Sequence, residues 1–228
     1  AKVEKLRVGL LSGPLMAGGL DHPEARESVA ATGKLLEGLG HHVEVASPAA
    51  LGEAEFGDMF LAIVIAHIAN DVAALEKSFG VSLTTDDIEP GNHLMAQFGN
   101  ATNVVAYLSA VTWMQAWTRR VVSWWLPRDG KNAFDILVTP TLAGPPPKIG
   151  ALSGDDSTDR IREIMQYTAQ FNMTGQPAIS LPLHMSASGL PMGVQFVGAP
   201  YREDVLLRLA AQLEAAAPWS GRRPAVHA

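Results

Sequence analysis

The stretch FDILVTPT, residues 134–141, constrains the fold more than any other part of the chain. Ile136, Leu137 and Val138 form an unbroken apolar run, so a strand here would be apolar on both faces. Such strands are typical of sheets that are covered by other elements on both sides. Pro140 then ends the run. The stretch therefore predicts a central strand in a layered α/β fold.

Segments with strand and helix periodicity alternate around this stretch. Strands are expected at 6–11, 42–46, 178–183 and 192–198, and helices at 21–39, 50–78, 103–125, 158–170 and after Pro200. The helix at 21–39 makes a parallel crossover, and the turn residues at 185–191 indicate an antiparallel hairpin. Residues 79–102 look irregular because they contain several glycines and a proline. We therefore predict an α/β fold with a mixed β-sheet flanked by helices, in a single domain over residues 1–228.

Two of the expected helices carry further signals. Asp21 is a good N-cap for the helix at 21–39, and Glu24 completes a capping-box pattern. The helix at 103–125 ends before Pro127 and has one apolar stripe, made of Tyr107, Ala110, Val111, Met114, Trp117, Val121 and Trp125. This stripe fits ordinary core packing, and it also fits the wall of an aromatic substrate pocket.

Composition excludes several classes of function. The formal net charge is -6 and the basic pairs are limited to Arg119-Arg120 and Arg222-Arg223, so no nucleic-acid partner is expected. The chain has no cysteine, which excludes disulfides, thiolate metal sites and a cysteine nucleophile. The longest apolar block, residues 59–66, is far shorter than the roughly 20 residues that cross a bilayer. We expect a cytoplasmic protein with no membrane partner.

The sequence contains no recognisable reaction centre. It has no Gly-x-Ser-x-Gly elbow, no His-Glu-x-x-His helix and no Gly-x-Gly-x-x-Gly turn. His41 and His42 are adjacent on an expected strand and would point to opposite faces, which is poor geometry for one metal ion. The residues alone thus predict pocket walls, with no catalytic residue, no metal and no cofactor.

Four stretches resemble the amidase signature family in the order expected for the second half of such an enzyme. The first, LRVGLL (6–11) followed by DHPE (21–24) and LEGLGHHVEVASP (36–48), resembles the segment where that half begins. FDILVTPTLAGPPPKIG (134–150) is similar to the family's strand and Thr-Pro-Thr loop, and FNMTGQPAISLPL (171–183) is similar to its Asn-x-Thr-Gly-x-Pro pattern. GLPMGVQFVGAPYREDVLLRLAAQLE (189–214) resembles the closing hairpin and helix. The resemblance implies the amidase signature fold, represented here by its carboxy-terminal half only.

The resemblance also implies a reaction whose catalysts are missing from this chain. Family members hydrolyse carboxylic amides through an acyl-enzyme made by a Ser-Ser-Lys set in their first half. None of the thirteen serines here lies in a Gly- and Ser-rich run, and Lys77-Ser78 is the only adjacent Lys and Ser. We therefore expect this chain to supply scaffold and pocket walls and to be inactive alone. Its expected partners are a small amide substrate and the missing amino-terminal half, and a homodimer is also compatible.

Substrate-binding positions are implied by the same resemblance. Thr139 and Thr141, expected on the loop after the central strand, and Asn172 and Thr174, expected on the turn before the next, would face the substrate. Each could instead stabilise its own turn. Arg119 or its neighbour Arg120 falls where amidotransferase relatives place an arginine that binds a carboxylate.

One departure from the family bears on the substrate. Amidotransferase relatives carry an acid several residues before the motif's Asn, where this chain has Met165-Gln166-Tyr167-Thr168. Because a buried ammonium group without a partner is costly, we expect an amide with an apolar or aryl acyl portion. The alternative hypothesis is a stand-alone module that binds a small amide or a protein without turning it over.

Overall fold

The computed structural model describes residues 4–15, 19–127, 133–152 and 157–224. Contacts within the chain divide it into two compact units, one of residues 1–52 and 121–228 and the other of residues 53–120. The first holds the sheet and the second is helical. The single domain expected from the sequence stays a prediction, because two clusters of contacts do not by themselves define two domains.

The sheet unit contains five strands in the order β2-β1-β3-β5-β4. They are β1 (Arg7–Leu10), β2 (His42–Val45), β3 (Ile136–Pro140), β4 (Ala178–Met185) and β5 (Pro191–Gly198). β1 is parallel to both β2 and β3, whereas β5 is antiparallel to β3 and β4. The predicted mixed sheet is confirmed.

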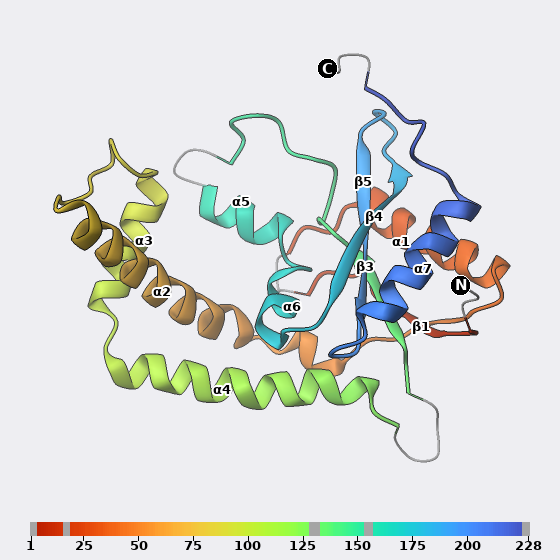
Figure 1. Cartoon of the computed structure of the whole chain (residues 1–228), viewed down its shortest axis with the longest axis horizontal. Helices are drawn as coiled ribbons and strands as arrows, with labels where there is room; N and C mark the ends of the chain where they lie inside the picture. Colours follow the sequence, from red (N-terminus) through yellow and green to blue (C-terminus); the bar gives the residue numbers. More distant parts are fainter. Residues whose placement is uncertain (1–3, 16–18, 128–132, 153–156, 225–228) are drawn as a thin grey trace. The chain divides into compact units, whose positions relative to one another are not determined.

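Helices cover both faces of this sheet, as the central strand requires. All five residues of β3 are buried. Helices α1 (Pro23–Gly38) and α7 (Glu203–Ala216) pack on one face, around a core that includes Val8, Val138 and Phe196. The short helices α5 (Ser157–Ile164) and α6 (Ala169–Thr174) precede β4, and α6 lies on the other side of the strands from α7 (Figure 1).

The start of α1 differs from the expectation. Asp21 is not the N-cap, because its carboxylate is held by the guanidinium of Arg26. His22 caps the helix instead, and its Nδ1 accepts a hydrogen bond from the Glu24 N–H at 3.2 Å. Glu24 likewise does not close a capping box, because its Oε1 accepts from the Ala187 N–H.

The helical unit is built from three helices, α2 (Phe56–Phe79), α3 (Pro90–Ala101) and most of α4 (Val104–Val122). The one-turn helix η1 (Ala49–Gly52) leads toward it, and η2 (Ser123–Trp125) follows α4. The expectation of irregular chain over 79–102 was wrong for α3. Pro90 occupies the first turn of α3, where a missing N–H does no harm, and so starts the helix rather than preventing it.

The apolar stripe of α4 is mostly interior, which favours its interpretation as core. Ala110, Met114 and Trp117 are buried, and the Trp117 ring lies 4.6 Å from that of Phe56. Arg120 on the adjacent face is paired with Glu53.

By length and composition alone, α2 could also cross a membrane, with a mean hydropathy of 1.6 over its most apolar window. The core helix of a soluble protein passes the same test and is mostly buried, whereas 11% of this window is buried. The absence of a membrane partner stays a prediction.

Helices α2 and α3 approach closely at Gly99. A Cβ at this position would lie 2.1 Å from the backbone oxygen of Ile65 and 2.7 Å from the Cβ of Ala69. We predict that Gly99→Ala lowers the free energy of unfolding by about 1–3 kcal/mol through overpacking. Denaturant unfolding followed by circular dichroism measures this change.

Gly91→Ala is the matched control within α3, because nothing lies within 4 Å of its added methyl group. It should be neutral or stabilise by up to about 1 kcal/mol, since alanine favours a helix over glycine. Equal losses for the two variants would contradict the proposed close packing.

Candidate functional site

The candidate site lies at the carboxyl ends of the parallel strands of the sheet unit. In open α/β sheets, ligands bind in crevices outside these ends. Thr141 follows β3 directly, and its N–H donates to the Gly193 carbonyl of β5 at 3.0 Å. The Thr-Pro-Thr loop is therefore held at the edge of the sheet where ligand binding is expected.

Two hydroxyl groups meet at this edge over a glycine. Thr141 Oγ1 and Ser180 Oγ lie 2.6 Å apart, although β5 separates their strands, β3 and β4. Strands two places apart are roughly 10 Å apart, so the two side chains reach each other across β5. Gly193 permits this contact, because a Cβ there would lie 2.5 Å from Ser180 Oγ and 2.8 Å from Thr141 Oγ1.

A small cavity opens beside the hydroxyl pair. Its volume is about 150 Å³, and it is lined by Thr141, Leu142, Gly144, Pro146, Ser180, Pro191, Met192 and Gly193. Two hydroxyls in a mainly apolar lining could orient one polar group of a ligand while its apolar part contacts the walls. The lining contains the two hydroxyls and no His, Lys, Asp or Glu side chain that could serve as a base beside them.

Beneath the cavity lies a buried polar network that includes Thr139. Thr139 belongs to β3, not to the loop after it, and is fully buried. Gln195 Nε2 donates to Thr139 Oγ1 at 3.0 Å and to the Tyr167 carbonyl at 2.8 Å. Gln195 of β5 thus connects the sheet to the segment before α6, and Thr139 accepts one of its two hydrogen bonds. A direct contact between Thr139 and a substrate stays a prediction.

The same network holds the loop that follows β1. The Tyr167 hydroxyl donates to the carbonyls of Ser12 and Gly13, at 3.2 and 3.0 Å. Burial raises the pKa of Tyr167 to about 12, which keeps the phenol protonated as a donor at neutral pH. The neighbouring Gln166 accepts a hydrogen bond from the Leu15 N–H and donates one to the Leu20 carbonyl. Tyr167 and Gln166 therefore both bond to the chain that follows β1.

Asn172 and Thr174 lie in α6, where a turn was expected. The turn begins only at Gly175, which caps the helix with a positive φ of 66°. Asn172 is exposed, and the Thr174 hydroxyl donates to the Phe171 carbonyl at 3.4 Å. Neither residue lines the hydroxyl cavity, and their role in substrate binding stays a prediction.

The two arginines of α4 differ in their surroundings. Arg120 Nε donates to Glu53 Oε1 at 2.8 Å, and this bond raises the pKa of Arg120 and lowers that of Glu53. Arg119 is exposed, and within the described part of the chain it forms no ion pair. Arg119 belongs to the helical unit, and the threonines belong to the sheet unit. Substrate binding by Arg119 stays a prediction.

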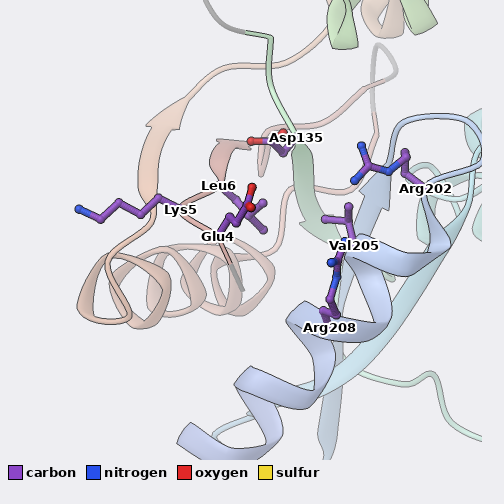
Figure 2. Close-up of a pocket in the computed structure, with 7 residues that line it drawn as sticks. All are labelled: Glu4, Lys5, Leu6, Asp135, Arg202, Val205 and Arg208. Atoms are coloured by element: carbon purple, nitrogen blue, oxygen red, sulfur yellow. The ribbon is translucent and has the colours of Figure 1, made fainter. Parts of the chain in front are cut away.

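A second cavity of the sheet unit lies at the opposite ends of the strands (Figure 2). It has a volume of about 360 Å³ and is lined by Glu4, Lys5, Leu6, Asp135, Arg202, Val205 and Arg208. Arg202 extends toward Asp135, whereas Lys5 points away from the other side chains. Both arginines are also paired with Asp204. These charges largely compensate one another, so we do not assign a ligand to this cavity.

Two further observations limit the choice of site. A wide apolar hollow of about 530 Å³ lies along α4 and is lined by Val105, Leu108, Ser109, Thr112, Trp113 and Ala116, without a charged group. Among the residues that the structure describes, no group of three or more His, Asp or Glu side chains is placed to hold a metal ion.

Sequence reasoning missed Ser180, Gly193 and the Gln195 network. Ser180 lies inside the motif 171–183 and alternates with apolar residues, which marks it as facing away from the core. Its contact with Thr141 depends on the order of β3, β5 and β4 in the sheet. A local sequence pattern does not predict that order.

A mixed α/β sheet of this kind binds ligands in the crevice outside the carboxyl ends of its parallel strands. A family model described as Amidase matches residues 1–207. The chain therefore belongs to the Amidase family, as its resemblance to amidase signature enzymes predicted.

Individual relatives support this assignment. The 6-aminohexanoate-cyclic-dimer hydrolases of Pseudomonas sp. (strain NK87) and Paenarthrobacter ureafaciens are each 36% identical over 96% of the chain and 45% of their own length. A solved 6-aminohexanoate cyclic dimer hydrolase matches with a TM-score of 0.89 and 34% identity, over 99% of this chain and 48% of that one. A bacterial aryl acylamidase at 20% identity and a TM-score of 0.77 shows the fold alone. The chain thus spans about half the length of these relatives.

We predict that Gly193→Ala forces the Thr141–Ser180 hydroxyl pair apart and lowers the free energy of unfolding by about 1–3 kcal/mol. Gly198→Ala in the same strand is the matched control, because its nearest contacts would be ordinary at 3.5 Å or more. Urea unfolding compares the two variants. A loss for Gly198→Ala as large as that for Gly193→Ala would contradict a specific role of the glycine beneath the hydroxyl pair.

Tyr167→Phe should reveal the pH dependence of the loop network. The folded-state pKa of about 12 exceeds the usual value of 10, so the network's stabilisation is fully present below pH 10 and is lost as the pH rises toward 12. Wild type should exceed the variant in unfolding free energy by about 0.5–1.5 kcal/mol at neutral pH, and the gap should shrink above about pH 10. Urea titrations across this range measure it. A gap that is constant with pH would contradict a protonated, bonded Tyr167.

Proposed function

We propose that this chain is the carboxy-terminal half of an amidase that hydrolyses a carboxylic amide through an acyl-enzyme. The observation that carries the proposal is the match to a solved cyclic dimer hydrolase over 99% of this chain but only 48% of that one. A match of this extent supports a shared fold whose other half lies outside these residues. In this proposal the other half supplies the Ser-Ser-Lys set, and this chain supplies scaffold and pocket walls.

In this proposal the chain's pocket wall lies at the carboxyl ends of its parallel strands. Thr141 and Ser180 present hydroxyls beside a small apolar cavity, where they can orient an amide by hydrogen bonding. Serine attack on the amide carbonyl, release of the amine and hydrolysis of the acyl-enzyme by water all belong to the other half. The role of these walls is to hold the substrate so that its carbonyl stays in line for attack.

The substrate class follows from a missing charge. Gln166 stands in the stretch where glutamine-recognising relatives have an acid, and its amide is committed to backbone groups of the β1 loop. We propose that the site does not bind an ammonium group and prefers an amide with an apolar acyl portion. The cyclic dimer named for the relatives fits this class, because ring closure consumes both its amino and its carboxyl groups.

The test uses the complete enzyme, with this chain joined to its amino-terminal half. We expect kcat/KM for the cyclic dimer of 6-aminohexanoate to exceed that for the zwitterionic linear dimer at least tenfold. Equal activity on the two dimers would contradict the proposed substrate class. Saturable binding of the cyclic dimer without turnover would contradict the amidase and favour the binding-module hypothesis.

Asn172→Ala in the complete enzyme should lower kcat/KM at least several-fold, because Asn172 presents an unburied amide on α6 in the family's motif. Asn100→Ala, at an exposed position of α3, is the control and should leave kcat/KM unchanged. Steady-state kinetics with a thermal unfolding check distinguish binding from folding. Unchanged kinetics for Asn172→Ala would assign Asn172 to the scaffold.

A further inference from the structure

Gln166 is a buried side chain whose amide bonds to three backbone groups. Its Oε1 accepts from the Leu15 N–H at 2.8 Å, and its Nε2 donates to the carbonyls of Leu20 and Glu163, at 2.8 and 3.0 Å. A glutamine amide has two N–H donors and one carbonyl acceptor, so each of these groups is in use. This one side chain therefore joins the chain between β1 and α1 to the last turn of α5.

Leu20, which Gln166 holds by its carbonyl, packs against a wall of the hydroxyl cavity. Gly144 lines this cavity, and a Cβ added to Gly144 would lie 3.4 Å from Leu20 Cδ2 and 3.4 Å from His22 Cγ. Leu20 and His22 therefore lie directly against Gly144. His22 is fixed by its own hydrogen bond at the start of α1, whereas Leu20 is fixed by Gln166.

The same part of the wall has a second contact, through α5. The N–H of Ala143, the residue before Gly144, donates to the Ile164 carbonyl at 3.0 Å. Ile164 is the last residue of α5, and Gln166 bonds to the carbonyl of Glu163 beside it. Gln166 is therefore linked to Gly144 through Leu20 and to Ala143 through the end of α5.

We propose that Gln166 is a positioning residue for the hydroxyl cavity, which acts through Leu20 on the wall at Gly144. The inference rests on the proposed function, because it takes this cavity to be part of the amide pocket. Thr141 is held by the sheet through its bond to Gly193, so the distance between the hydroxyls and the Gly144 wall depends on the contacts that Gln166 maintains. A wall that contacts the substrate before and during the reaction contributes uniform binding, and its loss raises KM more than it lowers kcat.

The test compares four variants of the complete enzyme. Gln166→Met keeps the length of the side chain and removes its hydrogen bonds, whereas Leu20→Ala removes the packing on Gly144 and leaves Gln166 in place. The double variant shows whether the two residues act through each other, because the effects of coupled residues do not add. Gln212→Met is the matched control, because it removes the bond between Gln212 Oε1 and His41 Nε2 from α7, on the other side of the strands from α6 (Figure 1).

We expect Gln166→Met and Leu20→Ala each to raise KM for the cyclic dimer of 6-aminohexanoate at least fivefold, while kcat changes less than twofold. The double variant should raise KM less than twofold beyond the larger single effect, and Gln212→Met should change KM less than twofold. A wild-type KM for either single variant, a double variant whose effect is the product of the two single effects, or an equal rise for Gln212→Met would each overturn the inference.

Hydrogen exchange tests the same positioning without an assay, on variants that thermal unfolding shows to be folded. The Leu15 and Ala143 amides should exchange at least tenfold faster in Gln166→Met than in Gln212→Met. Unchanged exchange at Ala143 would overturn the positioning role even if hydrolysis of the cyclic dimer supports the proposed function. Faster exchange at Ala143 in an enzyme that does not hydrolyse the cyclic dimer would contradict the proposed function and support the positioning of this wall by Gln166.

Discussion

The burial of β3 on both faces is the constraint on which the sheet unit depends. Its five residues are all buried, between β1 on one side and β5 on the other. A strand in this position requires cover above and below, which α1 and α7 provide on one face and the segment around Tyr167 on the other. Pro140 is the last residue of this buried strand, so Thr141 is the first residue beyond it. The position of Thr141 in the candidate site therefore follows from the way β3 is packed in the core.

The site itself depends on Gly193, which has no side chain. A Cβ at position 193 would lie 2.5 Å from Ser180 Oγ and 2.8 Å from Thr141 Oγ1, so the two hydroxyls could not keep their contact across β5 without Gly193. The network below, from Thr139 through Gln195 to Tyr167, holds the β1 loop at the same edge. A preorganised wall of this kind suits a chain that positions a substrate for chemistry performed elsewhere.

Much of the fold could be predicted from sequence, because periodicity and the doubly apolar strand 136–138 are local signals. The errors arose where tertiary contacts override local preference. Arg26 takes the carboxylate of Asp21 and leaves the cap to His22, and Gly99, which looked like a helix breaker, is what lets α3 pack on α2. In the site, Thr141 could be named from its motif. Its partner Ser180 is brought to it by the strand order 3-5-4, which no local pattern encodes.

The chain spans about half the length of its relatives in the Amidase family, and its sheet unit holds a small cavity beside two hydroxyls. We propose that this cavity wall cannot hydrolyse an amide without the other half. The most direct test is a p-nitroanilide assay on the purified chain, after intact mass has shown a single 24.2 kDa species. We predict no hydrolysis above the uncatalysed rate. Saturable turnover by that single species would contradict the claim and would require a catalytic group within these residues.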